Sequence, residues 1–235
     1  MTTTMTDPLD SASLLARCAL PQSLTGASTV DTSSDATAAA TSAITHCALA
    51  DMSALARAGI RGREAADFLA ALGFEVPSVP NTAMIQGDGS WLVRLSVGEF
   101  LQLAPYIAPE AGIADLPLIQ QADDALAKGM RVHSLPRRDS HAWFSLSGSS
   151  IPALMAKLCG VDLRSEAFPP GSVAQTSVAR TNAIIVNVGS SGCPCFHLLF
   201  DIASSHYLWG VMLDAMREYS GEKVTAAALL AHHRG

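Results

Sequence analysis

The second half of the chain carries a run of hydrophobic patterns that predicts a strand, a short helix, three strands and a second helix. The first strand is expected at residues 142–146, where large apolar side chains alternate along the chain. A turn at residues 147–150 can cap the helix, whose apolar positions fall on one face: Ile151, Leu154, Met155 and Leu158. The remaining elements are strands at 173–180, 182–188 and 196–201 and a helix that begins near Ser204.

The first half shows the same order of patterns. Gly62 ends a possible strand over residues 54–60 and precedes a helix with matching apolar offsets: Ala65, Phe68, Leu69 and Leu72. Strands follow near 82–86, 91–95 and 100–103, and a helix over 118–128 ends at Gly129. Gly87-Asp88-Gly89 is typical of a hairpin turn and not of a phosphate loop, because no helix start and no lysine follow it.

These patterns predict an α+β fold made of two β-α-β-β-β-α repeats, which we place at residues 47–135 and 136–221. Residues 1–46 are rich in Thr, Ser and Ala and are expected to form a flexible N-terminal arm, while residues 222–235 are expected to be a C-terminal tail. Two interpretations of the arm stay open. It is either a frayed end, or a segment whose Leu14 and Leu15, on a short helix, dock on another subunit.

Composition narrows the classes of function. Charged residues make up 15% and hydrophobic residues 49% of the 235 positions, which suits a subunit covered by partners as well as a simple alanine-rich chain. The formal net charge of -6 argues against nucleic acid as the main partner. No apolar run is long enough for a membrane span, and five irregularly spaced cysteines suit a reduced, cytoplasmic protein.

Two clusters of reactive side chains do not predict a catalytic or metal site. Cys193, Cys195 and His197 alternate along one expected strand, whereas tetrahedral zinc usually takes ligands from two separate elements. Ser140 and His141 are adjacent, and neighbouring side chains on a strand point to opposite faces, so with Asp139 they do not form a catalytic triad. We therefore expect no catalytic and no metal-binding residue, and the sequence assigns no cofactor-binding residue.

Asp51 and Ser53 are a carboxylate and a hydroxyl two residues apart, just before the first expected strand. Such a pair can bind a ligand, but it more often satisfies backbone groups at a turn. We favour the second interpretation.

The sequence motifs resemble a known family. In the second half, the segments PRRDSHAWFSLSG, LCGVDLRSEAFPPGSVAQTSVARTNAIIV and FHLLFDIASSHYLWGVMLDAM resemble the gamma subunits of heterotetrameric sarcosine oxidases. In the first half, LADMSALARAGIRGREAADFLAALG and GSWLVRLSVGEFLQLAP are similar to the wider fold family of the glycine-cleavage T protein and its folate-binding relatives. The resemblance covers residues 48–221, more specifically in the second half than in the first.

This resemblance implies a structural or assembly subunit with no cofactor of its own. Its expected partners are an alpha subunit with NAD and a folate region, a beta subunit with FAD and covalent FMN, and a delta subunit with zinc. The complex would oxidatively demethylate sarcosine or a related N-methyl amino acid such as N-methylglutamate and pass the one-carbon unit to tetrahydrofolate. The alternative is a stand-alone folate-binding or aminomethyltransferase-like protein. Candidate interface residues are Leu14, Leu15, Arg137, Arg138 and Asp139.

Overall fold

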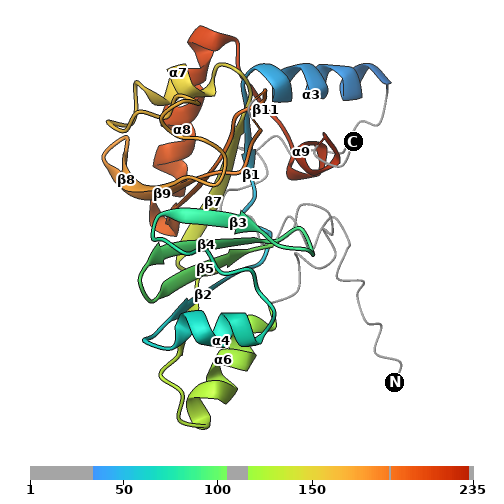
Figure 1. The fold of residues 1–235 in the computed structure, drawn as a ribbon. Helices are drawn as coiled ribbons and strands as arrows, with labels where there is room; N and C mark the ends of the chain where they lie inside the picture. Colours follow the sequence, from blue (N-terminus) through green and yellow to red (C-terminus); the bar gives the residue numbers. More distant parts are fainter. Residues whose placement is uncertain (1–33, 105–115, 191, 233–235) are drawn as a thin grey trace.

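The computed structural model of the chain describes residues 34–104, 116–190 and 192–232, and it contains two antiparallel-rich sheets between layers of helices (Figure 1). The first sheet has six strands in the order β11-β1-β7-β10-β9-β8. Their bounds are β1 (Ala48–Asp51), β7 (His141–Ser147), β8 (Val173–Val178), β9 (Thr181–Asn187), β10 (Cys195–Asp201) and β11 (Glu222–Lys223). The predicted α+β class is therefore confirmed.

The second sheet has five strands in the order β3-β4-β5-β2-β6. Their bounds are β2 (Arg57–Arg61), β3 (Thr82–Ile85), β4 (Trp91–Ser96), β5 (Glu99–Leu103) and β6 (His133–Pro136). The turn between β3 and β4 is the predicted hairpin, with Gly89 at a φ of 82°. The carboxylate of Asp88 accepts a hydrogen bond from the backbone N–H of Ser90 at 2.8 Å and fixes this turn.

Helices cover the outer faces of the two sheets, so the molecule has four layers in the order helix, sheet, sheet, helix (Figure 1). On the six-stranded sheet lie α7 (Ile151–Met155) and α8 (Ser205–Met216), the latter flanked by the short helices η1 (Ile202–Ser204) and η2 (Arg217–Tyr219). On the five-stranded sheet lie α4 (Ala65–Ala71) and α6 (Leu118–Ala127). A third core fills the space between the sheets and includes Trp143, Leu101 and Leu199.

Two successive runs of the chain have the same order of elements. They are β2-α4-β3-β4-β5-α6 and β7-α7-β8-β9-β10-α8, and within the sheets the orders β3-β4-β5-β2 and β8-β9-β10-β7 also match. The strand that precedes each run pairs with the other run. Thus β1 is antiparallel to β7, and β6 is antiparallel to β2.

This exchange crosses the boundary drawn between residues 135 and 136. Strand β1 falls in the predicted first unit, yet it belongs to the six-stranded sheet of the second. Likewise β6 spans the boundary itself, and it forms an edge of the five-stranded sheet, next to β2. A hydrophobic pattern shows that a segment is a strand, but it does not show which neighbour completes its hydrogen bonds.

Both ends of the described chain also differ from the sequence expectation. The arm predicted over residues 1–46 ends in a helix, α3 (Ser34–His46), in which Ala43 and Ile44 are buried against the inter-sheet core. The predicted tail contains β11, parallel to β1, and α9 (Ala226–His232), which contacts α3. Burial of Leu229 and Leu230 stabilises α9, which is too short to be stable as an isolated helix.

Candidate functional site

The β1–β2 connection and the β6–β7 connection meet at the buried side chain of Arg57, which is 4% exposed. Its Nη1 donates to the carbonyl oxygens of Ser53 and Leu55 at 2.9 and 2.8 Å. Its Nη2 donates to the carbonyl oxygen of Arg138 at 2.7 Å. The carbonyl oxygen of His141 accepts two hydrogen bonds, one from Nε at 3.0 Å and one from Nη2. One guanidinium therefore joins the two connections that exchange strands between the sheets.

Burial, with a smaller contribution from the nearby Arg138, lowers the pKa of Arg57 to about 10, while Asp51 and Asp139 oppose the shift. The group still carries its charge at neutral pH. A buried cation is tolerated here because its donors are satisfied by backbone carbonyl groups.

Asp51 and Ser53 organise the backbone at the same crossing. The Asp51 carboxylate accepts a hydrogen bond from the N–H of Ser53 at 2.9 Å. The Ser53 hydroxyl accepts one from the N–H of Trp143 at 2.9 Å, and both residues are buried. The interpretation that this pair satisfies backbone groups at a turn is confirmed.

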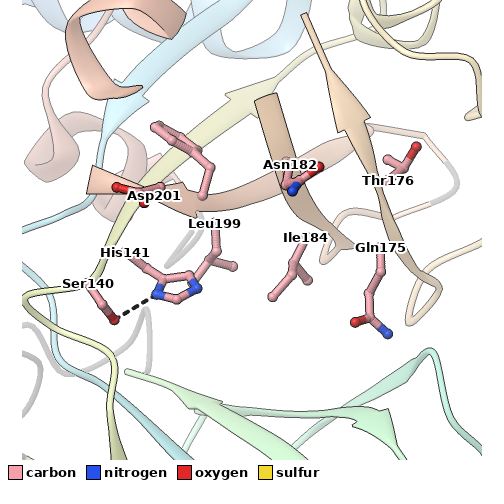
Figure 2. A pocket seen from close by; sticks show the side chains of 10 residues that line it. Ser140, His141, Gln175, Thr176, Asn182, Ile184, Leu199 and Asp201 are labelled. Atoms are coloured by element: carbon pink, nitrogen blue, oxygen red, sulfur yellow. Dashed lines mark hydrogen bonds between the residues drawn. The ribbon is translucent and has the colours of Figure 1, made fainter. Parts of the chain in front are cut away.

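A pocket of about 590 Å³ lies beside this crossing, on the face of the six-stranded sheet that looks toward the second sheet (Figure 2). Its polar lining residues are Ser140, His141, Gln175, Thr176, Asn182 and Asp201, and its apolar ones are Ala183, Ile184, Leu199 and Phe200. The strand register brings them together. His141 pairs with Asp201 across β7 and β10, Leu199 pairs with Ile184 across β10 and β9, and Ile184 pairs with Gln175 across β9 and β8.

His141 is half-buried in the pocket wall. Its Nδ1 lies 2.8 Å from the hydroxyl of Ser140, and its Nε2 lies 3.5 Å from Nη1 of Arg137. Because a guanidinium has only donors, Nε2 is assigned as the acceptor and Nδ1–H as the donor to Ser140. Burial lowers the pKa of His141, Arg137 and Arg57 lower it further, and Asp201 opposes them. The ring is therefore neutral at pH 7.

The contact between Ser140 and His141 corrects the sequence argument, which placed the two side chains on opposite faces. Ser140 lies in a turn before β7 rather than on the strand, so strand alternation does not apply to it. The contact is at Nδ1, and Asp139 does not line the pocket. The three adjacent residues thus do not have the geometry of a nucleophilic triad.

The predicted interface residues have different positions. Arg137 forms an ion pair with Glu99, Nη2 to Oε1 at 2.6 Å, which ties the β6–β7 connection to β5. Arg138 is half-buried and supplies a carbonyl oxygen to Arg57, and Asp139 is exposed. Leu14 and Leu15 lie outside the described residues.

The Cys-x-Cys-x-His segment is mostly buried. Cys195 and His197 lie inside β10, while Cys193 precedes the strand and is partly exposed. Burial raises the pKa of Cys195 to about 12, so its thiol stays protonated. The ring of His197 meets that of Trp143 edge to face at 4.9 Å between centroids. Within residues 34–104, 116–190 and 192–232, no three His, Cys, Asp or Glu side chains are arranged to hold a metal ion.

Sequence reasoning did not identify Gln175, Asn182 and Asp201 as site residues. Asp201 is 60 positions from His141, and their pairing depends on the register between β7 and β10. In the described part of the chain no helix has the length and hydropathy of a membrane span.

No family model and no curated protein matches the chain. Among solved structures, its fold is similar to a chain of the heterotetrameric sarcosine oxidase from Corynebacterium sp. U-96, with a TM-score of 0.63 and 21% identity over 80% of this chain and 94% of that one. It is also similar to the glycine cleavage system aminomethyltransferase T from Bartonella henselae, with a TM-score of 0.56 and 17% identity over 83% of this chain. The chain spans about half (52%) of that aminomethyltransferase. At these identities the likeness establishes a shared α+β fold.

Proposed function

We propose that this chain is a non-catalytic, gamma-type structural subunit of a sarcosine-oxidase-type complex in the cytoplasm. The complex would oxidatively demethylate sarcosine or a related N-methyl amino acid and pass the one-carbon unit to tetrahydrofolate. Its partners would be alpha, beta and delta subunits. FAD, FMN, NAD, zinc and tetrahydrofolate would be bound by those partners and not by this chain.

The observation that carries the proposal is the extent of the fold match. The match spans 94% of the sarcosine oxidase chain but only 52% of the aminomethyltransferase. A protein with the fold and length of one chain of a multisubunit oxidase is a good candidate for the same place in such a complex. Because one fold supports many activities, the assembly of the chain into a complex is the property to test.

The polar groups described at the crossing also support a structural role. Arg57 and Ser53 make hydrogen bonds with backbone groups on both sides of the crossing. Such contacts position chain segments. This role of the polar groups is consistent with a structural subunit.

The test is a pull-down of the tagged, full-length chain from its native host, followed by size-exclusion chromatography and an absorption spectrum. Co-eluting larger subunits with flavin bands near one equivalent per chain would support the proposal. A colourless, monodisperse single chain would contradict it.

Variants of the candidate interface residues sharpen this test. Leu14→Asp with Leu15→Asp probes the arm, and Asp139→Arg probes the exposed part of the β6–β7 connection. Arg217→Glu is the matched control, because this side chain is 82% exposed at the start of η2, just after α8. Loss of flavin from the first two variants, with the control unchanged, would place the partner on those surfaces.

The alternative, a stand-alone folate-binding or aminomethyltransferase-like protein, is tested separately by calorimetric titration with tetrahydrofolate. The buried Asp51 does not line the pocket, so it does not supply that pocket with a carboxylate for a folate amine. Saturable binding by a colourless single chain would favour this alternative over the subunit proposal.

A further inference from the structure

Three chain segments meet at Gly62, where β2 has ended and the chain turns into α4 (Figure 1). The N–H of Gly62 donates to the carbonyl oxygen of Gly98 at 2.9 Å. A Cβ on Gly98 would lie 2.5 Å from the carbonyl oxygen of Gly62, and one on Gly62 would lie 2.0 Å from that of Arg131. Because neither glycine has a side chain, the β4–β5 turn and the segment before β6 both contact this turn. We call this surface the Gly62 corner, and it consists of Arg61, Gly62, Arg63, Val97, Gly98 and Arg131.

Exposed arginines gather at the Gly62 corner. Arg61 and Arg63 flank Gly62 in the sequence, and the backbone N–H of Arg131 donates to Oε2 of Glu64 at 2.7 Å. All three arginine side chains are exposed. Among the residues that the structure describes, no hydrogen bond or ion pair engages their guanidinium groups. A guanidinium has only donors, so these three groups are ready to bind carboxylates.

The acidic groups near the Gly62 corner are fewer than the arginines, and two of them are already engaged. Glu64 accepts the hydrogen bond from the backbone of Arg131. Glu99, the strand neighbour of Arg61, forms an ion pair with Arg137. Asp67 is exposed in the first turn of α4. The corner therefore has an excess of positive charge, on a chain whose formal net charge is -6.

The turn that carries Val97 is apolar and fixed in position. Val97 is 76% exposed, and its carbonyl oxygen accepts a hydrogen bond from Nη2 of Arg94 at 2.8 Å. Nη1 of Arg94 donates to the carbonyl oxygens of Pro77 and Ser78 at 2.8 and 3.0 Å, so one guanidinium ties this turn to the loop before β3. A backbone that is already fixed loses little conformational entropy when a partner binds. The exposed Val97 is therefore well placed for an apolar contact with a partner.

We propose that the Gly62 corner binds an acidic peptide segment of another protein. Carboxylates of the segment would pair with the guanidinium groups of Arg61, Arg63 and Arg131. An apolar side chain of the segment would cover Val97. Arginine suits this role because its N–H groups form a planar fork that matches a carboxylate. The binding would be a property of this chain alone and is independent of the subunit role.

The mixed character of the Gly62 corner favours a peptide over a nucleic acid. Glu64 and Asp67 would repel a backbone that carries a phosphate at every unit, whereas a peptide can place neutral residues opposite them. Val97 offers an apolar contact that a phosphate backbone does not use. The net charge of -6 opposes nucleic acid further.

Four probes separate the contributions of charge and apolar contact. They are the hexapeptides Glu-Leu-Glu-Glu-Leu-Glu, Gln-Leu-Gln-Gln-Leu-Gln and Glu-Gly-Glu-Glu-Gly-Glu, and a single-stranded hexathymidylate. Each is titrated into the purified full-length protein at low ionic strength, and the backbone amide signals of Gly62, Gly98 and Arg131 are followed by nuclear magnetic resonance. We expect saturable shifts with the first peptide and about tenfold weaker binding of the second and third. Equal affinity for the first two peptides, no saturable shift with the first, or tighter binding of hexathymidylate would overturn the proposal.

Two sets of substitutions locate the site. The double variant Arg63→Gln, Arg131→Gln removes two charges from side chains that make no contact in the described structure, so it should weaken binding of the first peptide about tenfold and leave the second unchanged. Val97→Ser should weaken both leucine peptides and leave the glycine peptide unchanged. Arg217→Gln is the control, at an 82% exposed position at the start of η2. Circular dichroism checks that each variant is folded, and unchanged binding of the first peptide by the folded double variant would refute the assigned surface.

Discussion

The guanidinium of Arg57 and the carbonyl oxygen of His141 are joined by two hydrogen bonds, one from Nε at 3.0 Å and one from Nη2. His141 begins β7 in the six-stranded sheet, and Arg57 begins β2 in the five-stranded sheet. The contact thus connects the first strands of the two runs that share an element order. The contact is also next to the pocket, because the side chain of the same histidine lines it.

Arg57→Met should destabilise the protein by about 3 kcal/mol or more. The change leaves the carbonyl groups of Ser53, Leu55 and Arg138 without their donor, and each buried acceptor left unpaired costs about 1–3 kcal/mol. The relief of burying a charge offsets part of this loss. Urea unfolding followed by circular dichroism measures the change. Arg217→Met, at an 82% exposed position, is the control, and equal stability of both variants would contradict the assigned role.

Trp143→Ala should destabilise the protein by about 3–5 kcal/mol, the usual cost of truncating a large buried aromatic side chain. Trp143 is 1% exposed and lies in the core between the sheets, in contact with His197. The comparison is Tyr207→Ala, at a 53% exposed site, where the hydrogen bond from the hydroxyl to the carbonyl oxygen of Ala179 is lost but far less buried surface is removed. The melting temperatures of the two variants are compared with that of the parent protein. An unchanged melting temperature for Trp143→Ala would show that packing of this side chain does not stabilise the fold.

Gly62→Ala and Gly148→Ala should both be strongly destabilising. A Cβ at Gly62 would lie 2.0 Å from the carbonyl oxygen of Arg131, and one at Gly148 would lie 2.3 Å from that of His46. Gly148 also has a φ of 124°, which L side chains rarely adopt. Gly160→Ala is the control, because a Cβ there meets no atom within 4 Å. Soluble yield and thermal unfolding of the three variants are the measurements, and wild-type behaviour of either clashing variant would refute the close approach.

Acidification should cost stability through His141. Its pKa is lowered in the folded protein, first by burial and then by Arg137 and Arg57, whereas in the unfolded chain it returns to about 6.5. Below that value the unfolded state binds the proton more readily. The contribution of His141 is therefore complete above about pH 6.5 and is lost as the pH falls through the lowered pKa of the folded state.

Unfolding free energies between pH 4 and pH 8 test this dependence on pH. His141→Gln should flatten the slope below about pH 6.5, because glutamine does not titrate. His206→Gln, at an exposed position on α8, is the control for replacing a histidine by glutamine. A slope that is identical in the parent and in His141→Gln would assign the effect to other groups.

Local patterns were enough to find most elements. The alternation over 142–146 and the helix spacing from Ile151 to Met155 appear as β7 and α7, because a strand or helix with one buried face records its period in the sequence. Gly62 and Gly148 each precede a helix with the same spacing of apolar residues, and both mark a close approach of backbone. The role of Asp51 and Ser53 was also predictable, since their partner N–H groups include one only two residues away.

Tertiary structure alone decided which strands pair and which side chains form the pocket. The sequence contains β1 and β6 but does not show that each completes the sheet of the other run, because edge hydrogen bonds are satisfied by any strand of suitable geometry. The pocket unites His141, Gln175 and Asp201 through the register of four strands, and a shift of one residue would turn these side chains to the opposite face. The sequence therefore determined the local elements, and the long-range pairing of backbone groups determined the site.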